Sequence, residues 1–326
     1  MRPASFDYAI NYSRYYLNPL WYASLLKRRA NIGLGKKFRS KTIYFVPTCD
    51  VELDPPWFSH SWESRTDLGL KEGLEQFLNI IQTADASCTF FVEGCITEKY
   101  VDYLDPLRNY DIGSHGYSHE AYSAHVVART ARPHKPTLQD RRKYLRLSVE
   151  AIRRFCGRSP LSFRAPMLHI DSDSLQLLEE EKIFIDSSIS NHFEGKIHPY
   201  HPSATNPTKQ GNREILEVPV TVNPRPKLLS LKAPYSLFSH PQRKIKHIAN
   251  VVRIIDSLSA QNNVPTVICT ISHVWEFSQT LKKRLGMVSF FGDVIQEITR
   301  NFDVTFLDLP SLSKMWNENI TPVIQS

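Results

Sequence analysis

From about residue 42 onward, short β-rich runs alternate with amphipathic stretches, and this alternation limits the possible folds more than any other feature of the sequence. The runs expected to be strands are residues 42–46 (ended by Pro47), 88–92, 111–114, 183–185, 215–222, 264–272 and 304–307. The stretches with apolar residues at helical spacing are residues 70–82, 138–155, 175–182, 247–261 and 288–301. This pattern predicts an α/β fold, a mostly parallel sheet with helices outside it, open or closed as a barrel.

The first 41 residues are basic and aromatic, with lysine and arginine interleaved with tyrosine and tryptophan. Such a segment could rest on an anionic membrane surface with its rings at the level of the headgroups. Alternatively, it is an extension that docks on the domain with its charges facing water. We favour docking, because no clean amphipathic period runs through the segment. We therefore expect an extension over residues 1–41, an α/β domain over 42–310 and a C-terminal tail over 311–326.

Signals for export and for membrane spanning are not recognisable. No uninterrupted apolar stretch follows the basic start, and no run of about 18 apolar residues predicts a spanning helix. The five cysteines are scattered and lack C-x-x-C spacing, which argues against a disulfide framework and a structural zinc site. We expect a cytoplasmic protein with reduced thiols, peripheral to the inner membrane if residues 1–41 contact lipid.

Two long loops are expected, over residues 121–137 and 191–213, and long loops at the strand ends of a barrel commonly shape a substrate cleft. The first loop is rich in arginine, lysine and histidine, so it either meets a phosphate-bearing substrate or is a solvated basic insertion. In the second loop we expect Tyr200 to contact substrate.

Three acids, Asp50, Glu52 and Asp54, follow the first expected strand. Alternating residues share a direction, so these carboxylates can face one crevice at the end of a parallel strand. Taken alone, the three acids are better explained as a solvated turn before Pro55.

A pair of histidines, His115 and His119, follows the strand expected at 111–114. Histidines four residues apart converge on one face of a helical turn, so both imidazoles can reach one metal ion. Two histidines and one carboxylate would leave coordination positions open for water and substrate, as a catalytic metal requires. The alternative is a pair of surface histidines.

Three further polar residues are candidates for the site: Arg164 shortly before a proline, Asp186 in Ile-Asp-Ser-Ser at the end of an expected strand, and His273 at the end of another strand, near a tryptophan. An arginine can pair in a forked fashion with a carboxylate. Each residue also has an ordinary structural explanation, namely a surface ion pair, a helix cap and a core histidine. Only their order along the chain, together with the acids and the histidine pair, points to a site.

In that order these motifs resemble the five-motif pattern of the NodB-homology polysaccharide deacetylases, over about residues 42–310. The similarity is greatest to the branch whose first motif reads aspartate, any residue, acid. Further matches are Thr-Phe-Phe-Val at 89–92, the run 111–119 and Glu-Val-Pro at 217–219. The resemblance implies a distorted (β/α)7 barrel of the NodB type.

The resemblance also implies roles for the site residues. Asp50 would be the general base and His273 the general acid, with Arg164 orienting Asp50 and favouring its charged form. Asp186 would help to set the protonation state of His273. We further expect substrate contacts from three residues, Tyr117, Pro166 and Trp275.

The same resemblance implies one divalent metal ion, zinc foremost, held by His115 and His119. The family's usual metal-binding aspartate is replaced by Val51, which cannot bind a metal. Glu52 is the expected substitute, and Asp54 is the competing candidate. The arginine motif reads Met167-Leu168 where the family has a glycine, so the adjacent substrate wall should differ.

We expect the protein to remove an N-acyl group, with acetyl as the first candidate, from an amino sugar. The sugar would be linked to a lipid or a nucleotide and used in the assembly of surface polysaccharide or lipopolysaccharide. The rivals are hydrolysis of another amide, by a deformylase or a metal-independent amidase, and a non-catalytic carbohydrate-binding protein. Nucleic-acid binding is not expected, because the net charge of +7 is scattered and no recognition module is apparent.

Overall fold

The computed structural model describes residues 42–56, 64–123, 136–190, 197–224, 237–238, 244–281 and 286–320. The extension expected over residues 1–41 lies outside the described residues, as does most of the basic loop expected over 121–137.

Seven short strands form one parallel sheet whose order is β7-β6-β5-β4-β3-β2-β9. The strands are β2 (Thr48–Val51), β3 (Thr89–Val92), β4 (Asp111–Ser114), β5 (Ser162–Phe163), β6 (Ile185–Asp186), β7 (Leu216–Glu217) and β9 (Ser272–His273). Three more strands, β1 (Ile43–Val46), β8 (Thr266–Cys269) and β10 (Val304–Phe306), pair in parallel in the order β10-β1-β8.

The first strand, β1, ends at Val46, directly before Pro47, as expected, but a second strand follows at once. Proline has no N–H to donate, so ladder pairing is interrupted at this residue, but the chain continues into β2. The Pro47 carbonyl still accepts a hydrogen bond from Thr89 N at 3.2 Å, which joins it to β3. Likewise β8 continues into β9 after Thr270 and Ile271. These two interrupted strands connect the two sheets.

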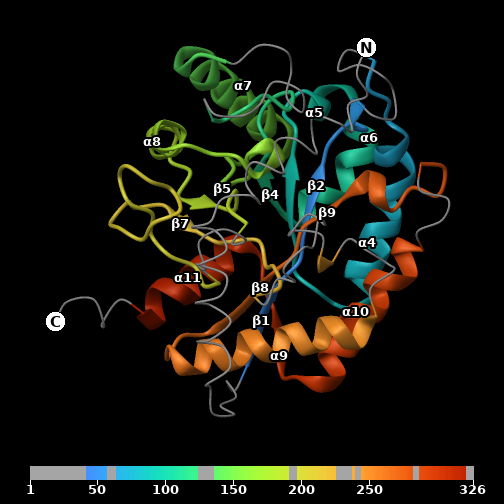
Figure 1. Cartoon of the computed structure of the whole chain (residues 1–326). Coiled ribbons are helices and arrows are strands. Elements are labelled where there is room, and N and C mark those ends of the chain that lie inside the picture. The colour runs from blue at the N-terminus through green and yellow to red at the C-terminus, as the bar shows by residue number, and fades with distance from the viewer. Residues whose placement is uncertain are drawn as a thin grey trace, which may run out of the picture.

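The parallel strands curl into a distorted barrel with helices outside it (Figure 1). Beyond β7, the backbone N–H of Thr221 donates to the Cys269 carbonyl at 2.8 Å, and Cys269 N donates to Thr221 Oγ1 at 2.9 Å. These bonds join the end of the β7 segment to β8. The expected fold class, a distorted (β/α)7 barrel of the NodB type, is confirmed.

The long helices lie where the apolar periodicity predicts them: α4 (Leu74–Thr83), α7 (Leu138–Cys156), α8 (Ser172–Glu180), α9 (Ile245–Gln261) and α10 (Met287–Asn301). Helix α4 continues a π-helical turn, η1 (Gly69–Gly73). At the start of α7, Thr137 and Asp140 form a capping box, and α7 ends at Gly157, whose φ of +76° is the left-handed conformation that glycine adopts without strain.

Several short elements were not expected. Between β3 and β4 the chain forms α5 (Ile96–Lys99), α6 (Val101–Leu104) and η2 (Asp105–Asn109). After β10, α11 (Leu309–Ile320) includes much of the tail expected from residue 311, and its Leu312 and Trp316 are buried in an apolar cluster, with α11 in contact with β1 and β6. These apolar contacts join α11 to the barrel.

The second long loop is described from residue 197 onward, and it pairs with the barrel. Tyr200 forms an antiparallel bridge with Glu217, and Pro202 forms another with Gln210. Tyr200 is buried and its hydroxyl donates to the Pro207 carbonyl at 2.8 Å. The Tyr200 side chain is thus bonded within the loop, and its contact with substrate stays a prediction.

The main core lies between the sheet and helices α4, α9 and α10. At its centre the Phe77 ring contacts the rings of Phe90, Phe277 and Phe291, with centroid separations of 5.8, 5.1 and 5.6 Å. All five cysteines lie in the part of the chain that the structure describes, and none of them forms a disulfide. None of the helices among the described residues has both the length and the apolar character that crossing a bilayer requires.

Candidate active site

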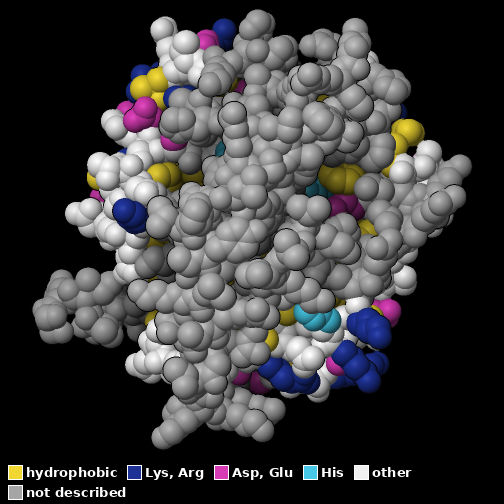
Figure 2. Space-filling model, in the orientation of Figure 1, with side chains coloured by type: hydrophobic (Ala, Val, Ile, Leu, Met, Phe, Trp, Pro, Cys, Tyr) yellow, Lys and Arg dark blue, Asp and Glu magenta, His cyan; other side chains and the backbone are white. Residues whose placement is uncertain are grey.

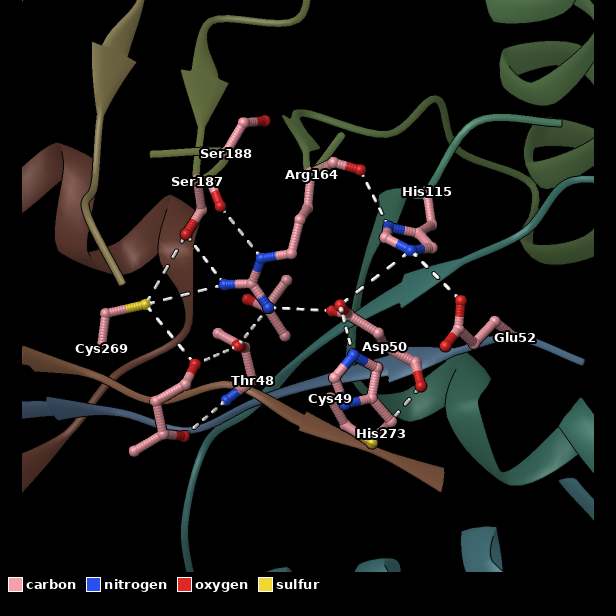
Figure 3. Close-up of polar contacts among 12 residues, drawn as sticks. Thr48, Cys49, Asp50, Glu52, His115, Arg164, Ser187, Ser188, Cys269 and His273 are labelled. Carbon is pink, nitrogen blue, oxygen red and sulfur yellow. Dashed lines mark hydrogen bonds and ion pairs between the residues drawn. The ribbon is translucent and has the colours of Figure 1, made fainter. Parts of the chain in front are cut away.

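Arg164, directly after β5, is the centre of a polar network at the carboxyl ends of the strands (Figure 3). Its guanidinium is fully buried, and Nη1 donates to Asp50 Oδ1 at 2.9 Å and to Thr48 Oγ1 at 2.6 Å. On the other side, Nε donates to the Ser187 carbonyl at 3.0 Å and Nη2 to Ser187 Oγ at 2.8 Å. Because each nitrogen has a partner, the guanidinium is held in one orientation, in which its positive charge faces the Asp50 carboxylate.

Asp50 follows the first strand, as expected, but lies within a second strand, β2, and its Cα pairs with that of His273 across β2 and β9. While Oδ1 accepts from Arg164, Oδ2 lies 4.0 Å from His115 Nε2 and 3.7 Å from His273 Nε2. The carboxylate is buried. One oxygen is therefore fixed by the arginine, and the other lies between two imidazoles.

His273 ends β9 and is followed by the short helix η5 (Val274–Glu276). Its Nδ1 lies 3.4 Å from Glu276 Oε2, and its backbone N–H donates to the same oxygen at 3.0 Å. Burial alone would lower the pKa of His273, but the carboxylates of Glu276 and Asp50 more than offset this and raise the pKa to about 9. The side chain keeps 18% of its area exposed, so this charged imidazole is within reach of a bound molecule.

The contacts of Asp186 differ from those expected, since none of its described contacts is with His273. Asp186 Oδ1 accepts from Ser188 Oγ at 2.5 Å, and Glu217 is its partner across β6 and β7. Both carboxyl groups are buried. Burial and the charge of Asp186 raise the pKa of Glu217 well above its usual range, so Glu217 carries the proton of the pair. The carboxylate beside His273 is Glu276.

Glu52, directly after β2, contacts both histidines of the H-x-x-x-H motif. Its Oε2 lies 2.9 Å from His119 Nε2 and 3.6 Å from His115 Nε2. One donor atom from each residue lies within 4.8 Å of the other two, and all three residues are buried. Burial alone would raise the pKa of Glu52, but the two imidazoles lower it well below its usual range. One carboxylate and two imidazoles are a donor set that suits a divalent metal ion.

The orientation of His115 also suits a metal. Its Nδ1 lies 2.8 Å from the carbonyl oxygen of Arg164, and a carbonyl can only accept a hydrogen bond. Nδ1 therefore carries the proton, and in the neutral ring Nε2 presents its lone pair toward Glu52. A backbone acceptor on the far nitrogen is the usual means of fixing the tautomer of a metal-binding histidine. The residues present thus fit a divalent cation.

The two histidines converge through a turn and not through the helical turn that their spacing predicts. Gly116 and His119 both adopt left-handed conformations, with φ of +72° and +64°. Glu120 stabilises the turn, because its Oε1 accepts from Tyr117 N and its Oε2 from Ser118 N, each at 2.8 Å. Buried backbone N–H groups in the turn are thereby satisfied.

Asp54, the competing candidate for the metal, faces another part of the fold. Its Oδ2 accepts from Thr66 Oγ1 at 2.5 Å and Leu68 N at 2.9 Å, and its Oδ1 accepts from Gly69 N at 2.9 Å. The carboxylate therefore caps the amino-terminal end of η1, where backbone N–H groups lack helical partners. The structure favours Glu52 over Asp54 as the carboxylate of the cluster.

The three residues expected to contact substrate differ in their surroundings. Trp275 is 8% exposed and its indole Nε1–H donates to Glu52 Oε1 at 2.8 Å. Pro166 is buried at the start of η3 (Pro166–Leu168), while Tyr117 is half-buried beside Gly94. Of these, Tyr117 has the most side-chain area available to a ligand.

The altered arginine motif has a backbone consequence. Met167 and Leu168 adopt φ of +63° and +56°, a region that glycine enters without strain and other residues enter at a cost. A glycine, which the family has in this motif, would fit this conformation. The wall beside Arg164 therefore keeps a left-handed turn but presents larger side chains.

The site comes to the surface at β9. In the space-filling view, histidine and acidic side chains are visible beside hydrophobic ones where Figure 1 places this strand (Figure 2). Glu276, Glu120 and Glu217 belong to the network but were not expected in it. Each stands close to a motif residue in sequence, yet local sequence gives no sign of which acid faces which partner.

The fold and the polar network define an α/β barrel protein with a buried carboxylate–imidazole cluster beside an arginine-bound aspartate. Residues 62–183 match the family model described as polysaccharide deacetylase, which confirms the resemblance to that family. A relative is the peptidoglycan deacetylase-like protein FGM2 of Gibberella zeae, 24% identical over 176 residues, which are 50% of this chain and 48% of that protein. The chain thus spans about half the length of this relative.

Solved structures with the same fold include two proteins assigned to the polysaccharide deacetylases. The one from Mycobacterium smegmatis has a TM-score of 0.60 and 19% identity, covering 87% of this chain and 93% of its own. The one from Pseudomonas aeruginosa PAO1 has a TM-score of 0.57 and 13% identity, covering 86% and 92%. PuuE allantoinase has a TM-score of 0.56 and 14% identity, also covering 86% and 92%. At these identities the likeness concerns the fold.

Proposed function

We propose that this chain is a metal-dependent hydrolase that removes an N-acyl group, acetyl foremost, from an amino sugar. The observation that carries the proposal is the position of Asp50. Its free oxygen lies between His115, a member of the Glu52–His115–His119 cluster, and His273, at 4.0 and 3.7 Å. A base between a metal-binding cluster and a charged imidazole is the arrangement that amide hydrolysis needs.

The cluster would hold one divalent cation, with zinc as the first candidate because carboxylate and imidazole ligands suit it. When bound, such a cation supplies Lewis-acid chemistry, since it polarises the acyl carbonyl and makes a water molecule more acidic. The tautomer of His115, fixed by the Arg164 carbonyl, supports this assignment.

The remaining steps fall to residues of the network. Asp50 Oδ2 takes the proton of the attacking water, while Arg164 holds Oδ1 and keeps the carboxylate in position. His273, protonated at neutral pH because Glu276 and Asp50 raise its pKa, donates a proton to the departing nitrogen. Protonation of that nitrogen lets the amine leave and makes cleavage of the C–N bond favourable.

The test combines metal content with hydrolysis of N-acetylated amino-sugar oligomers by the full chain. We expect about one equivalent of divalent cation in the wild type, lost in His119→Ala and in Glu52→Ala. Asp50→Asn should keep the cation and lose activity by about 10²- to 10⁴-fold, the usual contribution of a general base. Hydrolysis that continues unchanged in Asp50→Asn would contradict the assignment of the base.

Parallel assays with N-formyl sugars and with a ring amide separate the rival amide substrates. PuuE allantoinase, by its name, acts on allantoin, and it has the same fold as this chain. If the wild type binds no metal even when zinc is supplied, the metal-independent amidase and the carbohydrate-binding protein become the leading hypotheses.

We further propose a phosphate-bearing substrate, a lipid- or nucleotide-linked amino sugar used in surface polysaccharide or lipopolysaccharide assembly. The support is the basic composition of residues 121–137. Equal affinity for phosphorylated and unphosphorylated N-acetyl sugars would remove this part of the proposal. Membrane contact through residues 1–41 and the cytoplasmic location stay predictions.

A further inference from the structure

Trp275 hydrogen-bonds to the carboxylate that the proposed function assigns to the metal. Its indole Nε1–H donates to Glu52 Oε1 at 2.8 Å, while Oε2 of the same carboxylate faces His119 and His115 at 2.9 and 3.6 Å. Both Trp275 and Glu52 are buried. The indole N–H is a donor only, so it holds Oε1 and leaves Oε2 directed at the imidazoles.

The backbone around Trp275 is held close to η1. A Cβ at Gly69 would lie 2.5 Å from Trp275 Cα and 2.6 Å from Asp54 Oδ1, and a Cβ at Gly73 would lie 1.9 Å from the Val274 carbonyl oxygen. Two glycines four residues apart therefore let η5 pack directly on the backbone of η1. Because Asp54 caps η1 from the same segment that contains Glu52, the position of the indole is tied to that of the carboxylate.

The other face of this arrangement reaches His273. The Trp275 ring stacks on the His273 imidazole with centroids 4.8 Å apart and planes at 28°. One side chain thus contacts the expected acid with its ring face and the expected metal carboxylate with its N–H.

We infer that Trp275 is a positioning residue that fixes Glu52 so that Oε2 alone is offered to the cation, and that it is not a substrate-binding residue. This inference rests on the proposed function, because it presupposes that Glu52, His115 and His119 bind a metal. Glutamate is longer than the aspartate that is usual in the family, and its extra rotatable bond needs restraint to present one oxygen. The indole N–H supplies that restraint, as hydrogen-bonding partners of metal ligands commonly do.

The test is metal affinity of the full chain, measured for Zn²⁺ by competition with a chromogenic chelator and for Co²⁺ by its visible spectrum. Trp275→Phe keeps a ring that can stack on His273 and removes the N–H. We expect about 10- to 100-fold weaker Zn²⁺ binding and an altered Co²⁺ spectrum. Trp316→Phe, a buried tryptophan in the cluster around α11, is the matched control and should leave both unchanged.

A double variant shows whether Trp275 acts through Glu52. Glu52→Ala is expected to be purified without the ion, so its residual Zn²⁺ affinity is measured at added Zn²⁺ concentrations high enough for His115 and His119 to bind. This residual affinity should be the same with and without Trp275→Phe, because the bond that Trp275→Phe removes is already absent. A wild-type-like Zn²⁺ affinity in Trp275→Phe, or losses that multiply in the double variant, would overturn the inference. A wild type that binds neither ion would instead overturn the proposed function itself, and the inference with it.

A second measurement does not depend on the folding of the tryptophan variant. In protein labelled with ¹⁵N-tryptophan, the indole N–H resonance of Trp275 should move on addition of Zn²⁺ and in Glu52→Ala, while that of Trp316 stays in place. If the Trp275 resonance is indifferent to both changes, its N–H is not bound to the metal carboxylate and the inference is wrong.

Discussion

Arg164 and Asp50 form a fully buried ion pair, with Nη1 and Oδ1 2.9 Å apart and side chains that are 0% and 3% exposed. The same guanidinium binds Thr48 on β2 and Ser187 after β6, so three strands of the barrel meet at one side chain. Removing two charges from water is costly unless the pair is well oriented and fully hydrogen-bonded. The network meets that condition, and we therefore expect substitutions that remove one of its hydrogen bonds to lower the free energy of unfolding.

Replacing Arg164 by lysine should be strongly destabilising although the charge is kept. An ammonium group can bind Asp50 or Ser187 but cannot reproduce the planar fork that serves Asp50, Thr48 and Ser187 together. The polar groups left without partners predict a loss on the order of 3 kcal/mol in the free energy of unfolding, measured by urea denaturation.

Arg142→Lys is the control for this substitution. Arg142 forms an ion pair with Glu180, but the two side chains are 37% and 35% exposed, so the expected loss is below about 1 kcal/mol. Similar losses at the two positions would mean that the buried network is not what makes Arg164 necessary.

The long helices could be predicted because the necessary information is local. The helix expected over 138–155 is observed as α7 (Leu138–Cys156), since its apolar period, its cap at Thr137 and its stop at Gly157 lie within the segment itself. Strand β5 has only two residues and is defined by its barrel neighbours, so no period within it could reveal it. Strands β6 and β7 overlap the strands expected at 183–185 and 215–222, but with two residues each they are bounded by their pairing in the barrel and not by a local pattern. Helix α11 was missed for a related reason, because Leu312 and Trp316 are buried in a cluster formed with distant strands, among them β1 and β6.

For the site, motif order brought the right residues together but left their partners undetermined. Sequence could not decide between Glu52 and Asp54, because the decision depends on how η1 folds back to receive Asp54. Nor could it assign Glu276 to His273 in place of Asp186, since that depends on the direction of the chain after β9. The chemistry was visible in the sequence, and the pairing required the fold.

The pH dependence of activity should report the Glu276 carboxylate. As a general acid His273 must be protonated, so kcat/KM should fall as pH rises through its pKa, which Glu276 helps to raise to about 9. Glu276→Gln removes that charge and should move the alkaline limb of the profile to lower pH by on the order of 1 unit. The charge of a bound cation acts on the wild type and on Glu276→Gln alike, so the difference between their pH profiles reports the effect of the Glu276 charge alone.

Glu75→Gln, on the exposed face of α4, serves as the control and should leave the alkaline limb in place. If Glu276→Gln also leaves it in place, the limb belongs to a group other than His273.

Two Gly→Ala substitutions should change stability in opposite directions. At Gly69 the new Cβ would meet the backbone of Trp275 at 2.5 Å, so η5 must shift, and we expect a loss of about 1 to 3 kcal/mol in the free energy of unfolding. At Gly292, inside α10, the new Cβ would meet nothing within 4 Å, and the helix should gain about 1 kcal/mol. Urea denaturation measures both, and a neutral Gly69→Ala would show that η5 does not need this close approach.

The buried carboxyl pair of Asp186 and Glu217 should make stability depend on pH. Burial and the charge of Asp186 raise the pKa of Glu217 well above 4.5, so between 4.5 and the raised pKa the folded protein binds a proton that the unfolded chain has lost. The stability of the wild type therefore falls as pH rises through this window, by up to about 1.4 kcal/mol per pH unit. Glu217→Gln imitates the protonated group and removes the contribution of Glu217 to this dependence, so in urea denaturation between pH 5 and 8 the variant should gain on the wild type as pH rises toward the raised pKa of Glu217. Glu214→Gln, an exposed position before β7, should show a constant difference from the wild type over the same range. A constant difference for Glu217→Gln as well would mean that Glu217 is ionised in the folded protein. The assignment of a proton to Glu217 would then be wrong.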